Sequence, residues 1–208
     1  VGSVVTCSTD EGPDTVLSGF TITNGHAAEG GGMYTRSASP TVRHCVFTAN
    51  AADEVGGGMY SGPGNPEIAD CTFRGNSAVA GGGMCGWNDS NAVFTRCVFS
   101  ENTAYNGAGL CGRFCSLTAN ECSFHNNVAA GTGGGMLCYY TRAAVSRCTF
   151  TENEAAFGAG MVHESNASAI VVNCTLYANR ATEAGGGIYS QYDGSVNAIG
   201  CLFVGNWS

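Results

Sequence analysis

Short runs of alternating hydrophobic and polar positions return along the chain about every 26 residues. Seven segments read Cys-x-Phe/Leu-x-x-Asn, and successive cysteines of these segments lie 26, 26, 25, 26, 26 and 27 residues apart. A smaller residue separates Cys from Phe, so Cys and Phe point to one face of an extended chain. The pattern predicts a short strand with one buried face in every repeat. The repeated positions are Cys45, Cys71, Cys97, Cys122, Cys148, Cys174 and Cys201; Phe47, Phe73, Phe99, Phe124, Phe150 and Phe203; and Asn50, Asn76, Asn102, Asn127, Asn153, Asn179 and Asn206.

Two further positions recur with the same period and predict two more strands. One is the apolar residue that follows each Gly-Gly/Ala-Gly triplet, from Met33 to Ile188, and the other lies three residues before each Cys, as at Val42. Glycine triplets break helices and permit positive φ at a sharp corner. We therefore expect an all-β fold, a single parallel β-solenoid of about eight coils with about 26 residues and three short strands each. It spans residues 1–208, with an atypical first coil over 1–25 and regular repeats over 26–208.

Stacking of the coils gives each repeated column a physical role. Coils lie about 4.8 Å apart, so like residues lie on like residues. The phenylalanines are expected to form a continuous aromatic core. The asparagines are expected to bond along their column and to satisfy backbone groups of the turn.

The FxxN and GG[A/G]-apolar motifs resemble the repeats of chlamydial polymorphic outer-membrane proteins. More broadly, the chain resembles secreted bacterial right-handed parallel β-helix proteins of the planctomycete kind, whose opening repeat is similar to residues 15–25. The resemblance covers roughly residues 15–206. It implies a right-handed coil, an extracellular or cell-surface location, and adhesive or structural work.

Composition excludes several classes of function. Asp and Glu number 16, Arg numbers 8, lysine is absent and the net charge is −8, which disfavours binding to nucleic acid or to an acidic membrane surface. No apolar run reaches 18 residues, so we expect no membrane insertion.

Catalytic motifs are also missing from the chain, which has no P-loop, nucleophile elbow or zinc-hydrolase pattern. Glu101 and Glu152 share the position just before the repeated Asn and lie two coils apart. We interpret both as solvated surface carboxylates. We expect no enzyme activity, cofactor or metal site.

Twelve cysteines suggest an oxidising compartment. The seven in the repeated column are interpreted as buried free thiols, with disulfides between neighbouring coils as the alternative. Four others follow the glycine corner in three successive coils, where we predict the disulfides Cys85–Cys111 and Cys115–Cys138; four unpaired thiols are the alternative.

Aromatic residues gather in the variable segment that follows each glycine triplet and its apolar residue, a place called the Met corner below. Exposed aromatic side chains along one edge could bind a glycan or another surface ligand, although the segment could instead fold back over the coil. The residues are Trp87, Phe114, Tyr139, Tyr140 and Tyr192.

The length of 208 residues equals eight periods of 26, so Ser208 runs on in phase into Val1. We therefore expect an extracellular or cell-surface structural solenoid whose copies stack head to tail into a fibre. The alternatives are an adhesin or glycan-binding module that uses the aromatic edge, a fragment of a longer surface β-helix and, with less support, a polysaccharide lyase or hydrolase.

Overall fold

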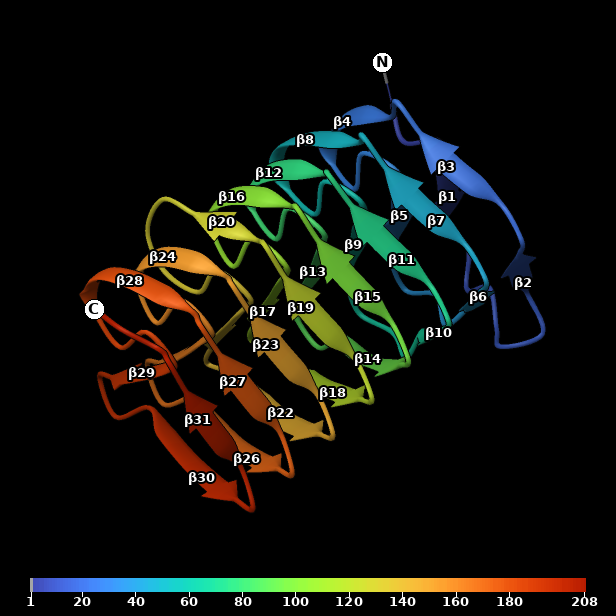
Figure 1. Ribbon diagram of the computed structural model, residues 1–208. Helices are drawn as coiled ribbons and strands as arrows, with labels where there is room; N and C mark the ends of the chain where they lie inside the picture. Colours follow the sequence, from blue (N-terminus) through green and yellow to red (C-terminus); the bar gives the residue numbers. More distant parts are fainter. Residues whose placement is uncertain (1) are drawn as a thin grey trace.

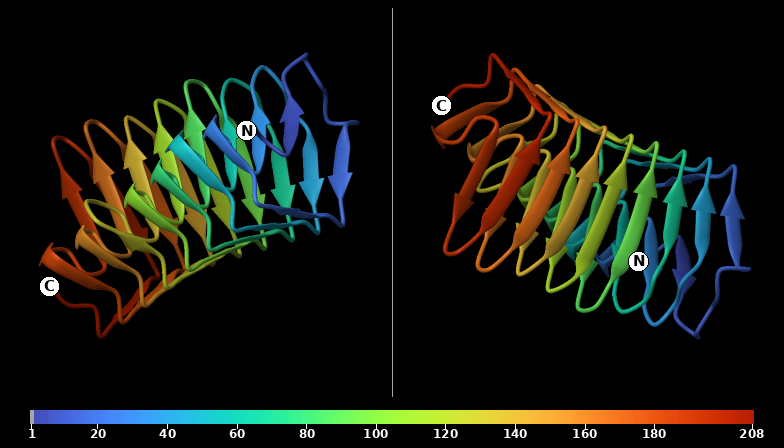
Figure 2. Two further views of the ribbon diagram at one scale, coloured as in Figure 1. Left: turned by 90° about the horizontal axis from the view of Figure 1, so that it is seen from above. Right: turned by 90° about the horizontal axis from the view of Figure 1, so that it is seen from below.

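The computed structural model describes residues 2–208 as a parallel β-solenoid of short strands, in which each coil stacks on the one before it (Figure 1). Val1, into which the chain was expected to continue from Ser208, lies outside the described residues. The views from above and below show the coils as a regular row from the N-terminal to the C-terminal end (Figure 2). Every strand pairing in the rod is parallel and joins residues about one period apart.

Three of the four sheets, A, B and C, contain strands that the sequence predicts. Sheet A starts at the Met corner of each coil and comprises β1 (Val5–Cys7), β5 (Met33–Thr35), β9 (Met59–Ser61), β13 (Met84–Trp87), β17 (Leu110–Arg113), β21 (Met136–Tyr139), β25 (Met161–Glu164) and β29 (Ile188–Gln191). Sheet B carries the apolar position before each Cys and comprises β2 (Val16–Ser18), β6 (Thr41–Arg43), β10 (Glu67–Ala69), β14 (Asn91–Thr95), β18 (Ser116–Asn120), β22 (Arg142–Ser146), β26 (Ser168–Val172) and β30 (Ser195–Ile199).

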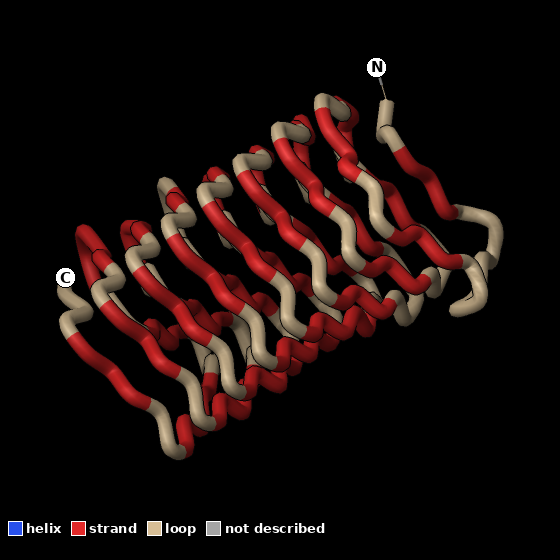
Figure 3. The backbone as a smooth tube through the Cα atoms, turned by 45° about the vertical axis from the view of Figure 1, so that its right-hand side comes forward, coloured by secondary structure: helices blue, strands red, loops and turns tan. Residues whose placement is uncertain are grey.

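Sheet C contains the ladder phenylalanines. It comprises β3 (Thr21–Thr23), β7 (Val46–Thr48), β11 (Thr72–Arg74), β15 (Val98–Ser100), β19 (Ser123–His125), β23 (Thr149–Thr151), β27 (Thr175–Tyr177) and β31 (Leu202–Val204). In the tube drawing these strands alternate with short turns along every coil (Figure 3).

A fourth sheet, D, corrects the expectation of three strands per coil. It comprises β4 (His26–Glu29), β8 (Ala51–Val55), β12 (Ser77–Ala80), β16 (Thr103–Asn106), β20 (Val128–Ala129), β24 (Glu154–Phe157) and β28 (Arg180–Ala184). The buried residues of this sheet are mostly alanines, such as Ala129 and Ala155. Alanine gives a weak hydrophobic signal and has low strand propensity, which is why the sequence pattern did not predict these strands.

The asparagine column forms the predicted ladder between sheets C and D. Asn102 Oδ1 accepts hydrogen bonds from the backbone N–H (3.0 Å) and from Nδ2 (3.1 Å) of Asn76, one coil earlier. Asn102 Nδ2 in turn donates to Asn127 Oδ1 (2.9 Å) and to the carbonyl oxygen of Phe73 (2.9 Å). The same pattern repeats at every step from Asn50 to Asn206. Buried turn groups that no strand reaches are thereby satisfied.

Phenylalanine rings stack face to face beside this ladder. Centroids of successive rings from Phe47 to Phe150 lie 4.6 to 4.9 Å apart, with interplanar angles of 1° to 5°. Leu176 replaces the aromatic ring in the following coil and is also fully buried. The predicted aromatic core is confirmed, because in-register pairing places each ring directly on the next.

The glycine triplets make the corner between sheets D and A. The first glycine of each triplet has positive φ, for example 66° at Gly81. The third lies against the next coil: a Cβ atom on Gly83 would come 2.4 Å from the carbonyl oxygen of Gly109. One triplet therefore requires glycine for two reasons, backbone conformation and close approach.

All twelve cysteines are free thiols in the structure, so the predicted disulfides Cys85–Cys111 and Cys115–Cys138 are absent. Cys85 and Cys111 do lie opposite each other in register, in a small apolar cluster outside the main core. Neighbours in a parallel ladder are near the lower limit of Cα separation for a disulfide. Cys115 and Cys138 lie in the main core at different positions of the coil; Cys115 Sγ is 3.7 Å from Thr141 Oγ1.

The interior cysteines are buried thiols that hydrogen-bond to the backbone. Cys71 Sγ accepts from the backbone N–H of Cys45 (3.4 Å) and donates to the carbonyl oxygen of Ala69 (3.2 Å). Burial raises the pKa of Cys71 to about 12. This thiol is therefore neutral and contributes to packing as a small apolar group.

We predict that Asn102→Ala destabilises the rod by about 3 kcal/mol, because two buried donors of Asn76 lose their acceptor. The measurement is the midpoint and slope of chemical denaturation followed by far-UV circular dichroism. Asn197→Ala, at an exposed position of β30, is the matched control and should leave the midpoint unchanged. Equal effects of the two substitutions would contradict a stabilising role for the ladder.

Candidate functional site

The turn between sheets A and B carries side chains that differ from coil to coil. One backbone position, next after the last residue of the β13, β17, β21, β25 and β29 strands, has positive φ in every one of these coils. Its residues are Asn88, Phe114, Tyr140, Ser165 and Tyr192. Because the backbone conformation is shared, side chains at this position project from one edge of the rod in a column.

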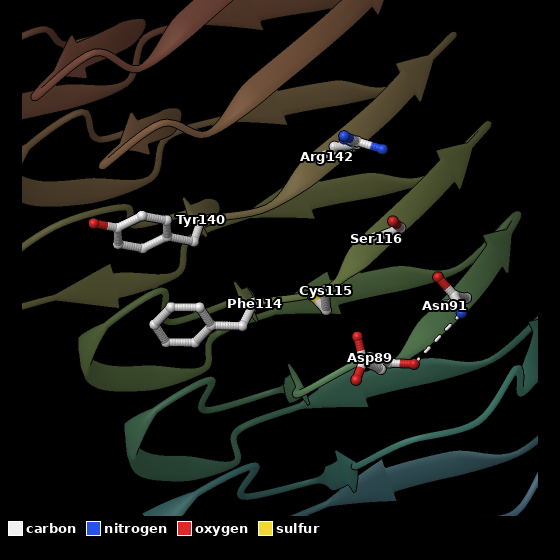
Figure 4. Close-up of a pocket in the computed structure, with 7 residues that line it drawn as sticks. All are labelled: Asp89, Asn91, Phe114, Cys115, Ser116, Tyr140 and Arg142. Atoms are coloured by element: carbon white, nitrogen blue, oxygen red, sulfur yellow. Dashed lines mark hydrogen bonds between the residues drawn. The ribbon is translucent and has the colours of Figure 1, made fainter.

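Phe114 and Tyr140 form one wall of an open groove along this edge. Their ring centroids are 5.0 Å apart with an interplanar angle of 12°. Figure 4 shows both rings on one side of Cys115, with Asn91, Ser116 and Arg142 on the other side. The groove has a volume of about 350 Å³ and is lined by Asp89, Asn91, Phe114, Cys115, Ser116, Tyr140 and Arg142.

Arg113 lies beside the groove between two other aromatic residues. Its guanidinium carbon is 4.9 Å from the ring centroid of Trp87 and 5.1 Å from that of Tyr139. The three residues are in register on β13, β17 and β21, so the sandwich follows directly from coil stacking. Trp87 and Tyr139 are therefore engaged by a cation within the protein, and the groove depends on Phe114 and Tyr140.

The structure divides the five predicted edge residues into three groups. Phe114 and Tyr140 line the groove, and Trp87 and Tyr139 hold Arg113. Tyr192 occupies the same turn position two coils beyond Tyr140 and is exposed, but it does not line this groove.

Sequence reasoning missed the polar half of the groove and the arginine sandwich. The missed residues are Asp89, Asn91, Arg113, Ser116 and Arg142. Alignment of the repeats could have found Arg113, because it stands at the same position as Trp87 and Tyr139. The others start sheet B strands or lie in the variable turn, where no repeated pattern marks them.

Glu101 and Glu152 share the turn position before the ladder Asn, with φ of 56° and 54°. Arg74, from the coil before Glu101, lies 3.0 Å from Glu101 Oε2. Glu101 is therefore paired with an arginine within the protein, as expected of an exposed surface carboxylate. Glu152 lies at the same corner of the rod, two coils further along.

One buried histidine has no hydrogen-bond partner among the described residues. His163 on β25 is fully buried, and neither ring nitrogen has a partner. Burial lowers its pKa from 6.5 to about 4. Its neighbours in register are Cys138 and Ser190. The imidazole is therefore neutral in the folded protein at physiological pH.

We predict that His163 makes the rod less stable in acid. Because the folded-state pKa is depressed, the unfolded chain binds the proton first as the pH falls. The stability is fully present above about pH 6.5 and falls by on the order of 3 kcal/mol as the pH drops towards 4.

The measurement is the free energy of unfolding from pH 4 to pH 7.5 for the wild type, for His163→Leu and for the control His44→Asn, at an exposed histidine of positive φ. His163→Leu should flatten this part of the pH profile, and the control should not. A steep profile that survives in His163→Leu would assign the acid sensitivity to other groups.

Within residues 2–208, no group of three or more His, Cys, Asp or Glu side chains is arranged to hold a metal ion. The same part of the chain contains no helix long and apolar enough to cross a membrane.

Comparison with known proteins gives one family match. A family model described as the right-handed beta helix region matches residues 80–208, more than half of the chain. This confirms the right-handed coil that the family resemblance implies. No curated protein and no solved structure matches the chain.

Proposed function

Since the chain belongs to the right-handed β-helix family, we propose that it is a structural solenoid of the cell surface or extracellular space, whose copies stack head to tail. The resemblance of its FxxN and GG[A/G]-apolar motifs to chlamydial outer-membrane repeats and to secreted bacterial β-helix proteins supports this location.

The last described coil exposes an apolar surface that fits either a further coil of the same chain or the first coil of a second copy; the proposal takes a second copy as its occupant. Phe203 occupies the inward ladder position, where Phe150 and the earlier rings are fully buried, yet 48% of Phe203 is exposed. Leu202 and Val204 on the same strand are exposed as well. β31 is also the last strand of sheet C and presents an unpaired edge.

The first described coil presents a complementary surface. β3 is the opposite edge strand of sheet C. Just before it, Phe20 occupies the position of the column cysteines but is 58% exposed. Pairing of β31 from one copy with β3 of the next would continue the sheet and cover both aromatic residues, which is β-strand addition with an apolar contact.

We predict that the 208-residue chain forms filaments that lengthen as its concentration rises, and that Phe203→Asp prevents their growth. A charge at this position would be buried without a partner at the junction. Sedimentation velocity and negative-stain electron microscopy over a concentration series measure the outcome.

Tyr177→Asp is the matched control, because Tyr177 is a similarly exposed aromatic residue on the side of sheet C. Circular dichroism verifies that each variant keeps its strands. Monodisperse rods about 38 Å long at high wild-type concentration, the length of eight coils, would overturn the stacking proposal.

A further inference from the structure

The groove at the turn between sheets A and B has an apolar wall that remains accessible. Phe114 and Tyr140 stack on each other, yet 45% and 44% of their respective surfaces are exposed. Both lie in the middle of the rod, with coils on either side, so their exposure does not depend on the terminal coils. Paired exposed aromatic residues at a concave site indicate a surface for a ligand with an apolar face.

The opposite wall combines different hydrogen-bonding groups. Asp89 supplies acceptors only, Arg142 supplies donors only, and Ser116 supplies both. Asn91 offers its Oδ1 as an acceptor, because its Nδ2 donates to Asn65 Oδ1 (2.9 Å) and to the carbonyl oxygen of Asp89 (3.4 Å). Arg142 has no carboxylate within 4.0 Å among residues 2–208. By contrast, Arg96 lies 2.7 Å from Asp70. The guanidinium of Arg142 is therefore free to bind a ligand.

A second groove continues from the first across the outer face of sheet B. It has a volume of about 340 Å³ and shares Ser116 and Arg142 with the first groove. The remaining lining residues are Leu117, Thr118, Ala143, Ala144, Ser168 and Ile170. The two grooves together favour an elongated ligand over a single small molecule.

We propose that this composite groove binds a neutral linear glycan built of pyranose sugars. One face of a pyranose ring carries C–H groups, which fit the negative face of Phe114 or Tyr140. The hydroxyl groups at the rim of the ring both donate and accept, so they can bind Asp89 and Arg142 alike. Further sugars of the same chain extend past Arg142 along sheet B.

Charge favours a neutral glycan over an acidic one. The carboxylate of Asp89 lines the groove, and the chain carries a net charge of −8. The net charge repels a polyanion and does not repel a polyhydroxylated neutral chain. Within the first groove Asp89 and Arg142 supply one charge of each sign. The site is also formed in advance, because the Phe114 and Tyr140 backbones donate to carbonyl oxygens of neighbouring coils at 3.0 and 3.3 Å. Little conformational entropy is therefore lost on binding.

The experiment is an array of immobilised neutral and acidic oligosaccharides probed with the full chain. Titration calorimetry then uses the neutral oligosaccharide with the strongest signal. Phe114→Asn and Tyr140→Asn should each weaken binding about tenfold, the scale of one aromatic contact. Asn already occupies this turn position at Asn88, so these variants keep a residue that the backbone accepts. Arg142→Gln should weaken binding several-fold.

Two controls separate the contact from folding. Tyr140→Phe keeps the ring and should retain wild-type affinity, and Tyr177→Asn, an exposed tyrosine on another face, should have no effect. Absence of binding to any neutral glycan, binding restricted to acidic glycans, or affinity unchanged by Phe114→Asn and Tyr140→Asn would each overturn the proposal.

Discussion

The hydrogen bond from one asparagine side chain to the next is the interaction on which the vertical register of this rod depends. Each Asn Oδ1 accepts both the backbone N–H and the Nδ2 of the asparagine one coil earlier, as between Asn76 and Asn102. A slip of one residue would leave these buried donors unsatisfied and would turn the stacked phenylalanines to the outer face. The ladder and the aromatic core therefore fix the same register, and the two constraints support each other.

A fixed register turns the outer surface into columns whose members come from residues about 26 positions apart. This is why Arg113 lies between Trp87 and Tyr139, and why Phe114 stacks on Tyr140. None of these residues contributes to the ladder. Their positions are determined by the interior, but their chemical identity is not, so a surface groove can vary while the core repeats.

The interior was predictable to the level of single columns because its residues recur with strict period and clear alternation. The fourth sheet was not, since alanines such as Ala155 mark no buried face in the sequence. The shared repeat position of Cys85 and Cys111 correctly indicates that they are neighbours. The spacing of cysteines along the sequence does not distinguish two thiols from a disulfide. In the groove, the aromatic wall was predictable from its place in the repeat, in the variable segment that follows the glycine triplet and its apolar residue. The polar wall of the groove was not predictable, because only the turn that precedes sheet B brings Asn91 and Arg142 to the same groove as Phe114.

The same turn explains why binding chemistry concentrates at this edge. At the corner between sheets D and A, glycine is required by backbone contacts, and at the corner between C and D the ladder position accepts asparagine only. The turn between sheets A and B has at least one residue of positive φ, at a position that here accommodates Asn88, Phe114, Tyr140, Ser165 and Tyr192. Phe114 and Tyr140 at this position are exposed and take no part in the ladder, so changes there alter the groove at little cost to the fold.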